Sequence, residues 1–287
     1  MKISDFRVKE GEKFKLSDIK TDFTGDIDNK EQAEVPTREN IEKLAGLQDK
    51  LYAQGKYGIL INIQAMDTAG KDGVIKHVMT GLNPQGTQVH SFKEPSVEEL
   101  NHDYLWRAVN HLPGRGYIGI FNRSYYEEVL VVRVHNLIQN EKIPSELINE
   151  DIWKKRYRQI NDFEEYLNEN GFIVIKIFLH ISKEEQRQRL LSRIDDKTKN
   201  WKFSAADIKE REFWNHYQKC YQELFRETST KNAPWYVIPS DSKWFSRYVF
   251  SEILLKSMEN LDLEYPNLNS EQQMQLQIYK QHLLDEE

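Results

Sequence analysis

The sequence contains a single cysteine, Cys220, in 287 residues. One cysteine excludes an internal disulfide framework and a cysteine-based metal cluster, and it is typical of a protein from a reducing compartment. No stretch approaches the roughly 18 consecutive apolar residues that a membrane span requires. The first residues, Met-Lys-Ile-Ser-Asp, lack the apolar region of a secretory signal. We therefore expect a cytoplasmic protein with no membrane association.

An excess of positive charge over the whole chain is also missing. The 40 Lys and Arg residues are outnumbered by 46 Asp and Glu residues, which gives a net charge of −6. This balance argues against non-specific coating of nucleic acid, so no nucleic-acid partner is expected. Residues 187–211 are different, because they hold eight Lys or Arg against four acids. We interpret this segment as part of a site for a specific polyanion, with a solvated helix face as the alternative.

Strand-like and helix-like patterns alternate over most of the chain. Apolar runs predict five strands, at residues 58–64, 88–92, 117–121, 172–179 and 235–239. Helical periodicity and capping residues predict helices at 36–55, 96–112, 152–170, from Ser182, 205–227 and 244–261. This alternation is typical of an α/β protein with one open, parallel, five-stranded sheet in three α/β/α layers. Ligands of such sheets bind at the carboxyl ends of the strands.

The chain shows no internal repeat and no flexible linker. Residues 1–35 are highly charged and weakly periodic, and we interpret them as an N-terminal arm that packs on the domain or on a neighbouring subunit. Residues 36–265 form the predicted domain, and residues 266–287 a C-terminal helix or tail.

Residues 64–73, Gln-Ala-Met-Asp-Thr-Ala-Gly-Lys-Asp-Gly, join the first predicted strand to a helix. This arrangement directs backbone N–H groups and a helix N-terminus at one point, where Lys71 adds a positive charge for phosphate oxygens. The segment departs from the phosphate-loop pattern G-x-x-x-x-G-K-[ST] at two places, Ala65 and Asp72. Because Asp72 replaces the magnesium-binding hydroxyl and Asp67 adds an acid, the metal must be held differently from that of most ATPases.

Two further segments carry candidate chemistry. Asn122 follows the third strand, where a phosphate-loop kinase usually has a metal-directed carboxylate, and Arg123 beside it can clamp a phosphate. Residues 193–210 are rich in charge and low in apolar periodicity. They are typical of a lid that closes over phosphates and excludes water.

Four motifs in order, residues 66–73, 81–86, 121–127 and 200–204, resemble those of the polyphosphate kinase family 2. The resemblance covers about residues 36–261. It implies a thymidylate-kinase-like P-loop kinase fold with a helical lid. It also implies Mg²⁺-dependent, reversible phosphoryl transfer between inorganic polyphosphate and nucleotides, with Mn²⁺ as an alternative ion.

The resemblance is more specific at Asn122 and at residues 82–86, Leu-Asn-Pro-Gln-Gly. Both are similar to the subgroup that converts AMP to ADP and ADP to ATP. The implied substrates are adenine nucleotides, with guanine nucleotides as an alternative. The implied assembly is a homodimer or homotetramer.

By the same resemblance, Asp67 holds the metal, Lys71 and Arg123 contact the transferring phosphate, and Arg193 is the lid arginine. We expect further substrate contacts from Ala69, Gly70, Asp72, Gly73, Lys76, Asn122, Tyr126, Glu127, Arg133, Lys199 and Lys202. Tyr126 could equally pack under the sheet. Two other functions stay open from the residues alone: an ATP-dependent nucleotide kinase of the same fold, and a non-catalytic polyanion-binding module.

Overall fold

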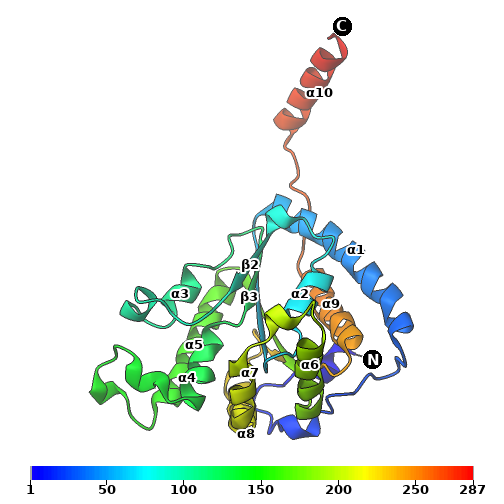
Figure 1. Ribbon diagram of the computed structural model, residues 1–287. Helices are drawn as coiled ribbons and strands as arrows, with labels where there is room; N and C mark the ends of the chain where they lie inside the picture. Colours follow the sequence, from blue (N-terminus) through cyan, green and yellow to red (C-terminus); the bar gives the residue numbers. More distant parts are fainter. Residues whose placement is uncertain (1, 287) are drawn as a thin grey trace.

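The computed structural model describes residues 2–286 and contains one five-stranded parallel sheet (Figure 1). The strands are β1 (Gly58–Ala65), β2 (Thr87–Ser91), β3 (Ile118–Asn122), β4 (Phe172–His180) and β5 (Trp235–Pro239). Their order in the sheet is β2-β3-β1-β4-β5, and every neighbouring pair is parallel. The predicted α/β class with a parallel five-stranded sheet is therefore confirmed.

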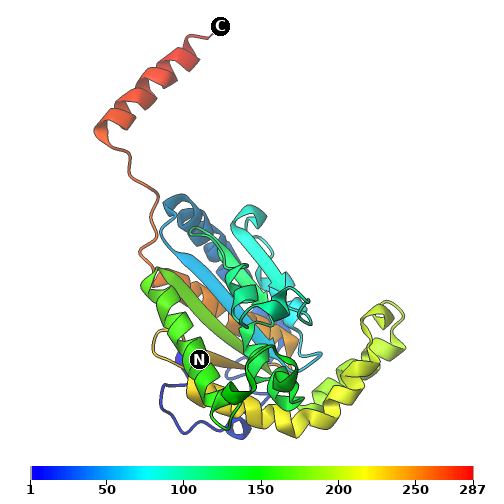
Figure 2. The ribbon, with the colours of Figure 1, turned by 90° about the vertical axis from the view of Figure 1, so that its left-hand side faces the viewer.

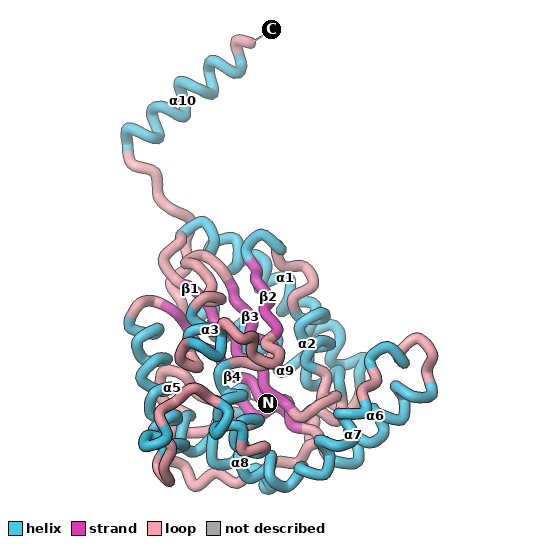
Figure 3. Tube along the Cα trace, turned by 60° about the vertical axis from the view of Figure 1, so that its left-hand side comes forward, coloured by secondary structure: helices cyan, strands magenta, loops and turns pink. Residues whose placement is uncertain are grey.

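Helices cover both faces of the sheet (Figures 1 and 3). One face carries α1 (Lys30–Gln54), α2 (Lys71–Val78) and α9 (Lys243–Glu259), and the other carries α5 (Ile152–Glu169) and α8 (Trp214–Thr228). The remaining α-helices are α3 (Trp106–Val109), α4 (Val131–Val134), α6 (Lys183–Asp195), α7 (Ala205–Glu210) and α10 (Ser270–Leu284). Short 3₁₀ turns occupy Ile3–Phe6, Leu16–Asp18, Pro84–Gly86, Glu99–Asn101, Tyr125–Val129, Leu137–Asn140, Ser145–Leu147, Asn200–Lys202 and Arg211–Phe213.

Within residues 2–286, no helix combines the length and the apolar character that crossing a bilayer requires.

Three predicted helices differ from those observed. The first begins at Lys30, not at Pro36, because the Asn29 side chain caps it by accepting from the Gln32 amide. Pro36 lies inside this helix, where it removes the hydrogen bond that a backbone N–H at this position would donate to the Gln32 carbonyl.

The helix predicted over residues 96–112 is also wrong. The capping box forms, since the Ser96 and Glu99 amides each bond to the other residue's side chain. However, only a 3₁₀ turn follows, and the Asp103 side chain then accepts from the Leu105 amide and starts the separate helix α3. The helix predicted over 205–227 is interrupted between α7 and α8 by a 3₁₀ turn at Arg211–Phe213.

The two ends of the chain behave differently. The N-terminal segment lies against the sheet edge, where the Val8 amide donates to the Trp235 carbonyl and Phe6 and Leu16 are buried. Helix α10 stands away from the domain at the end of an extended segment (Figures 1 and 2). Its apolar side chains, Met274 and Leu283 among them, are exposed.

A buried charged network lies between the sheet and α5. The Lys176 ammonium group donates to the Glu164 carboxylate at 2.6 Å, to the Tyr126 hydroxyl at 3.0 Å and to the Thr228 carbonyl at 2.5 Å. The hydroxyls of Tyr125 and Tyr126 donate to the other Glu164 oxygen. Lys176 is fully buried, and burial lowers the pKa of its ammonium group against the opposing effect of Glu164. A buried charge of this kind is tolerated only when its partners are complete.

We expect Lys176→Met to lower the free energy of unfolding by about 3–5 kcal/mol, because it leaves the Glu164 carboxylate buried without its cation. The double variant Lys176→Met/Glu164→Gln should recover part of the loss, since a neutral amide still accepts from both tyrosines. Urea unfolding measures both values. A double variant as unstable as the single one would contradict this account.

Candidate active site

The carboxyl ends of β1 and its neighbours meet at one edge of the sheet. The register places Asn122, the last residue of β3, beside Ile63 of β1 and Ser91 of β2. β1 continues into the loop at residues 66–70, and α2 begins directly at Lys71. The loop bends through left-handed backbone at Thr68 (φ 62°) and Gly70 (φ 108°). This is the strand–loop–helix geometry that binds phosphate.

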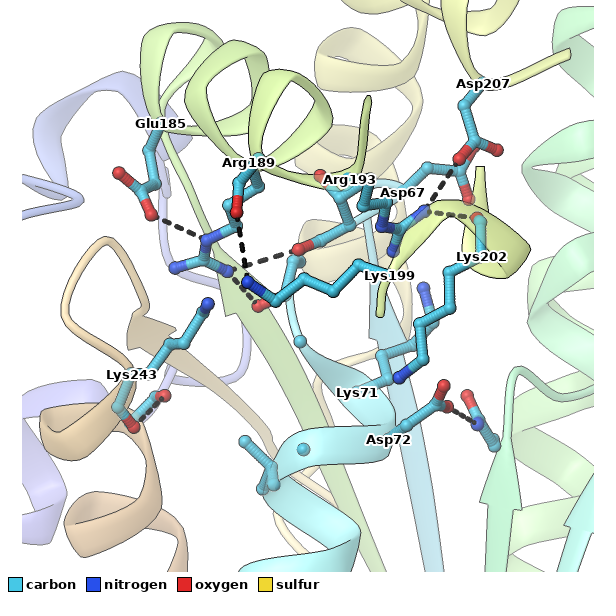
Figure 4. A pocket seen from close by; sticks show the side chains of 18 of the residues that line it. Asp67, Lys71, Asp72, Glu185, Arg189, Arg193, Lys199, Lys202, Asp207 and Lys243 are labelled. Atoms are coloured by element: carbon cyan, nitrogen blue, oxygen red, sulfur yellow. Dashed lines mark hydrogen bonds and ion pairs between the residues drawn. The ribbon is translucent and has the colours of Figure 1, made fainter. Parts of the chain in front are cut away.

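A cavity of about 830 Å³ opens at this edge (Figure 4). Its charged lining comprises nine Lys or Arg residues and four acids: Lys71, Lys93, Arg123, Arg189, Arg193, Lys199, Lys202, Lys243, Arg247, Asp67, Asp72, Glu185 and Asp207. The cavity is also lined by Ala69 and Gly70 of the loop, by Gly73 in the first turn of α2, and by Asn122 at the end of β3. A surplus of five positive charges in a chain of net charge −6 is the charge balance expected of a site for a polyanion.

Three of the four predicted catalytic residues meet at the loop. The Arg123 guanidinium forms an ion pair with Asp67 at 3.0 Å, and the Lys71 ammonium group donates to the Ala65 carbonyl at 3.1 Å. Burial and then the charge of Arg123 lower the pKa of Lys71. Burial alone would lower the pKa of Arg123, but the negative charges of Glu127 and Asp67 outweigh this effect. The pKa of Arg123 is therefore raised. Both cations lie at the loop and line the cavity.

Asp72 and Asn122 form a second pair on the other side of Lys71. The Asn122 amide donates to one Asp72 carboxylate oxygen at 2.7 Å. Asn122 thus holds the acid that replaces the usual hydroxyl residue of the loop. The other Asp72 oxygen accepts no hydrogen bond from residues 2–286, and Asp72 lines the cavity.

The lid segment, residues 193–210, extends beyond the body of the protein (Figure 2, yellow-green). Within it the Arg193 guanidinium donates to the Asp207 carboxylate at 2.9 Å and to the Lys202 carbonyl at 3.1 Å. Asp207 of the lid and Asp67 of the loop line the same cavity, and burial and then the charge of Asp67 raise the pKa of Asp207. Lys199 pairs with Asp196 at 2.7 Å, and both it and Lys202 line the cavity (Figure 4).

Four predicted substrate-binding residues do not line the cavity. The Tyr126 side chain lies in the core, bonded to Glu164 and Lys176, so packing under the sheet is the correct alternative. Arg133 donates to the Glu223 carboxylate and to the Tyr157 hydroxyl, away from the loop.

The other two are Lys76 and Glu127. Lys76 is exposed further along α2 and outside the cavity, because its position in the helix turns it away from the loop. Glu127 is half-buried and lies outside the cavity lining, and burial raises the pKa of its carboxyl group against the opposing charges of Arg123 and Lys71.

Several cavity residues were not predicted. Arg189 was counted in the basic segment without a role, and the structure buries it against the loop. Lys243 and Arg247 come from α9, whose predicted start carried no phosphate-binding pattern. Only the parallel topology brings α9 beside α2, so no local sequence signal could have identified them.

We expect Lys71→Ala to weaken the binding of inorganic tripolyphosphate at least tenfold, because a charge-assisted hydrogen bond contributes about 1.5–3 kcal/mol. Titration calorimetry measures the affinity. Lys76→Ala is the matched control, since it removes the same charge from an exposed position of the same helix. Equal losses in the two variants would mean that only the overall charge matters.

Comparison with known proteins agrees with this geometry. The family model Polyphosphate kinase 2 (PPK2) matches residues 27–266. An ADP-polyphosphate phosphotransferase of Rhodopseudomonas palustris is 47% identical over 99% of both chains. An AMP/ADP-polyphosphate phosphotransferase of Meiothermus ruber is 43% identical over 91% of this chain and 94% of that protein.

A solved structure is similar as well. The crystal structure of Polyphosphate Kinase 2 from Arthrobacter aurescens TC1 aligns with a TM-score of 0.86 and 37% identity over 95% of both chains. The fold is thus a P-loop kinase fold, and the chain is a phosphotransferase that belongs to the polyphosphate kinase 2 family.

Proposed function

We propose that this protein transfers phosphoryl groups reversibly between inorganic polyphosphate and adenine nucleotides, from AMP to ADP and from ADP to ATP, with guanine nucleotides as further acceptors. The observation that carries the proposal is the surplus of five cations around a phosphate loop in an acidic chain. The name of the Meiothermus ruber relative, AMP/ADP-polyphosphate phosphotransferase, supports both acceptors.

Phosphoryl transfer depends mainly on positioning and on charge stabilisation. Two unit charges of like sign at 4 Å repel by roughly 4 kcal/mol at an effective dielectric constant of 20. A nucleotide and a polyphosphate chain that meet end to end bring several such pairs together. Clustered cations are therefore needed before the two substrates can bind at once, and the cavity supplies them.

The residues at the loop divide this work. Lys71 and Arg123 hold the oxygens of the group being transferred, and the amides of the loop and of the first turn of α2 hold the neighbouring phosphate. The lid, residues 193–210, closes over the phosphates and excludes water that would hydrolyse them. Arg193 moves its guanidinium from Asp207 to the phosphates when the lid closes.

A magnesium ion, with manganese as an alternative, fits the acids that are present. Magnesium is usually held by one or two carboxylates together with substrate phosphates. Asp67 and Asp72 are such carboxylates, and each has one oxygen free of the pairs formed with Arg123 and Asn122. When bound, the ion would neutralise charge that develops on the transferring group. Asn122 contributes by orienting Asp72, not as a charged ligand.

We propose that the polyphosphate chain lies on the α9 side of the loop. Lys243 and Arg247 line the cavity there, and neither forms an ion pair with another described residue. Burial lowers the pKa of both side chains, and for Lys243 the charge of Glu185 opposes this shift only in part. A Cβ atom placed on Gly73 would lie 4.0 Å from a guanidinium nitrogen of Arg247. Arg247 therefore lies directly beside the phosphate loop. A chain of phosphates would supply the missing negative charge.

The deciding experiment incubates the protein with polyphosphate and magnesium, and with AMP or ADP as the only nucleotide. We expect AMP to yield ADP and then ATP, and ADP to yield ATP directly. Chromatography of the nucleotides measures the products. Transfer that requires ATP as donor would instead favour an ATP-dependent nucleotide kinase, and polyanion binding without any transfer would favour a binding module.

We expect the double variant Lys243→Gln/Arg247→Gln to raise the KM for polyphosphate about tenfold or more while changing the KM for the nucleotide little. The loss should shrink at high ionic strength, because salt screens exposed charges. Initial rates at varied polyphosphate and nucleotide concentrations measure both constants. A larger effect on the nucleotide would assign the α9 side to the other substrate.

We further propose that the protein works in the cytoplasm as a homodimer or homotetramer. The exposed apolar side chains of α10 support association, because an isolated helix of this length is only marginally stable in water. Light scattering of the purified protein measures the number of subunits.

A further inference from the structure

Helix α6 binds the outer side of the phosphate loop. The carbonyls of three successive loop residues, Asp67, Thr68 and Ala69, accept hydrogen bonds from two side chains of this helix. The Gln186 amide donates to the Asp67 carbonyl at 2.9 Å. The Arg189 guanidinium donates through one nitrogen to the Thr68 carbonyl at 3.2 Å and to the Ala69 carbonyl at 2.5 Å.

Arg189 is committed entirely to the protein. Its second terminal nitrogen donates to the carbonyls of Ser240 and Asp241, at 2.6 and 3.1 Å, and its Nε donates to the Glu185 carboxylate at 2.6 Å. The side chain is only 7% exposed. The planar fork of arginine thus fixes the loop to the segment that follows β5. This arginine has no donor left with which to bind substrate.

Gln186 is fixed just as firmly. It is 1% exposed, and its amide oxygen accepts from the Arg211 guanidinium at 2.7 Å. Because the oxygen is occupied, the amide nitrogen is the atom directed at Asp67. Arg211 also donates to the Lys183 carbonyl, and it lies where the lid ends and α8 begins.

These contacts determine which way the loop's peptide groups point. In a trans peptide the C=O and N–H point to opposite sides. The Asp67 and Ala69 carbonyls, drawn toward α6, therefore turn the amides of Thr68 and Gly70 toward the cavity, whereas the Ala69 amide donates to the Met66 carbonyl at 3.3 Å. The amides of Thr68, Gly70, Lys71, Asp72 and Gly73 donate to no carbonyl within residues 2–286. Thr68, which is not a glycine, is held at φ 62° in the process.

We propose that Gln186 and Arg189 are positioning residues that orient the amides of the phosphate loop for phosphate, without contacting substrate themselves. This inference rests on the proposed function for its substrate. Both residues precede the lid arginine Arg193 in the same helix, by seven and four residues. Helix α6 therefore carries the lid arginine and also donates hydrogen bonds directly to the loop, so it connects the lid with the loop.

The test compares three variants by titration with inorganic tripolyphosphate and by steady-state kinetics. Arg189→Lys keeps the charge but cannot reach four carbonyls, and Gln186→Leu keeps the volume but donates nothing. We expect each to weaken tripolyphosphate binding at least tenfold and to raise the KM for polyphosphate more than it lowers kcat. Arg187→Gln is the control, because Arg187 is exposed on the same helix and, among residues 2–286, pairs only with Glu184.

Circular dichroism and thermal melting check that the variants are folded at the assay temperature. If Arg189→Lys does not fold, Gln186→Leu decides alone. Wild-type affinity for tripolyphosphate in a folded Gln186→Leu protein would overturn the proposal, as would an equal loss in Arg187→Gln. Binding is measured without a nucleotide, so a wild-type protein that binds tripolyphosphate but transfers nothing would refute only the proposed function.

Discussion

Repulsion between like charges is the constraint on which this structure depends. A phosphate chain cannot be held next to a second phosphorylated molecule unless positive charge is concentrated at the point where they meet. Concentrated cations repel one another in turn, and the fold must hold them in place before any substrate arrives. Burial and the neighbouring Arg123 both lower the pKa of Lys71. The site is thus held in an electrostatically unfavourable state that an anion relieves.

The protein controls this charge in two ways. Some cavity cations have acidic partners, as Arg123 has Asp67 and Arg193 has Asp207. These pairs keep the arginines oriented and must be rearranged or shared when phosphate binds. Lys243 and Arg247 on α9 have no such partner among the described residues and are available at once. In the proposed mechanism, Arg123 and Arg193 act at the reacting end of the substrate together with Lys71, which donates to the Ala65 carbonyl, and Lys243 and Arg247 bind the rest of the phosphate chain.

The buried Lys176 shows the contrast between a structural and a functional cation. It is completely satisfied by Glu164, Tyr126 and Thr228, and no phosphate can reach it. Arg189 is similar, although it lines the cavity, because four carbonyls and one carboxylate use all its donors. Partners, not position alone, decide whether a basic residue in this protein serves the substrate or the loop that binds it.

The sequence by itself determined the parallel sheet, because apolar runs of strand length alternate with amphipathic helices. It also determined the phosphate loop, because the spacing of Gly70 and Lys71 after a buried strand is a local pattern. Asn122 and Arg123 could be assigned for the same reason, since both follow a strand end. Local patterns also gave Lys199 and Lys202 on the lid.

Only the tertiary structure decided the rest. Arg133 and Tyr126 carry suitable chemistry, but packing against Glu223 and Glu164 turns them away from the loop. Lys243, Arg247 and Arg189 are distant from the loop in sequence and reach it through the order of strands β1, β4 and β5. Which way a side chain points, and which acid neutralises it, depends on contacts between segments that are distant in the sequence, such as Arg133 with Glu223, 90 residues apart, and Arg189 with Ala69, 120 residues apart. A linear pattern carries no record of these contacts.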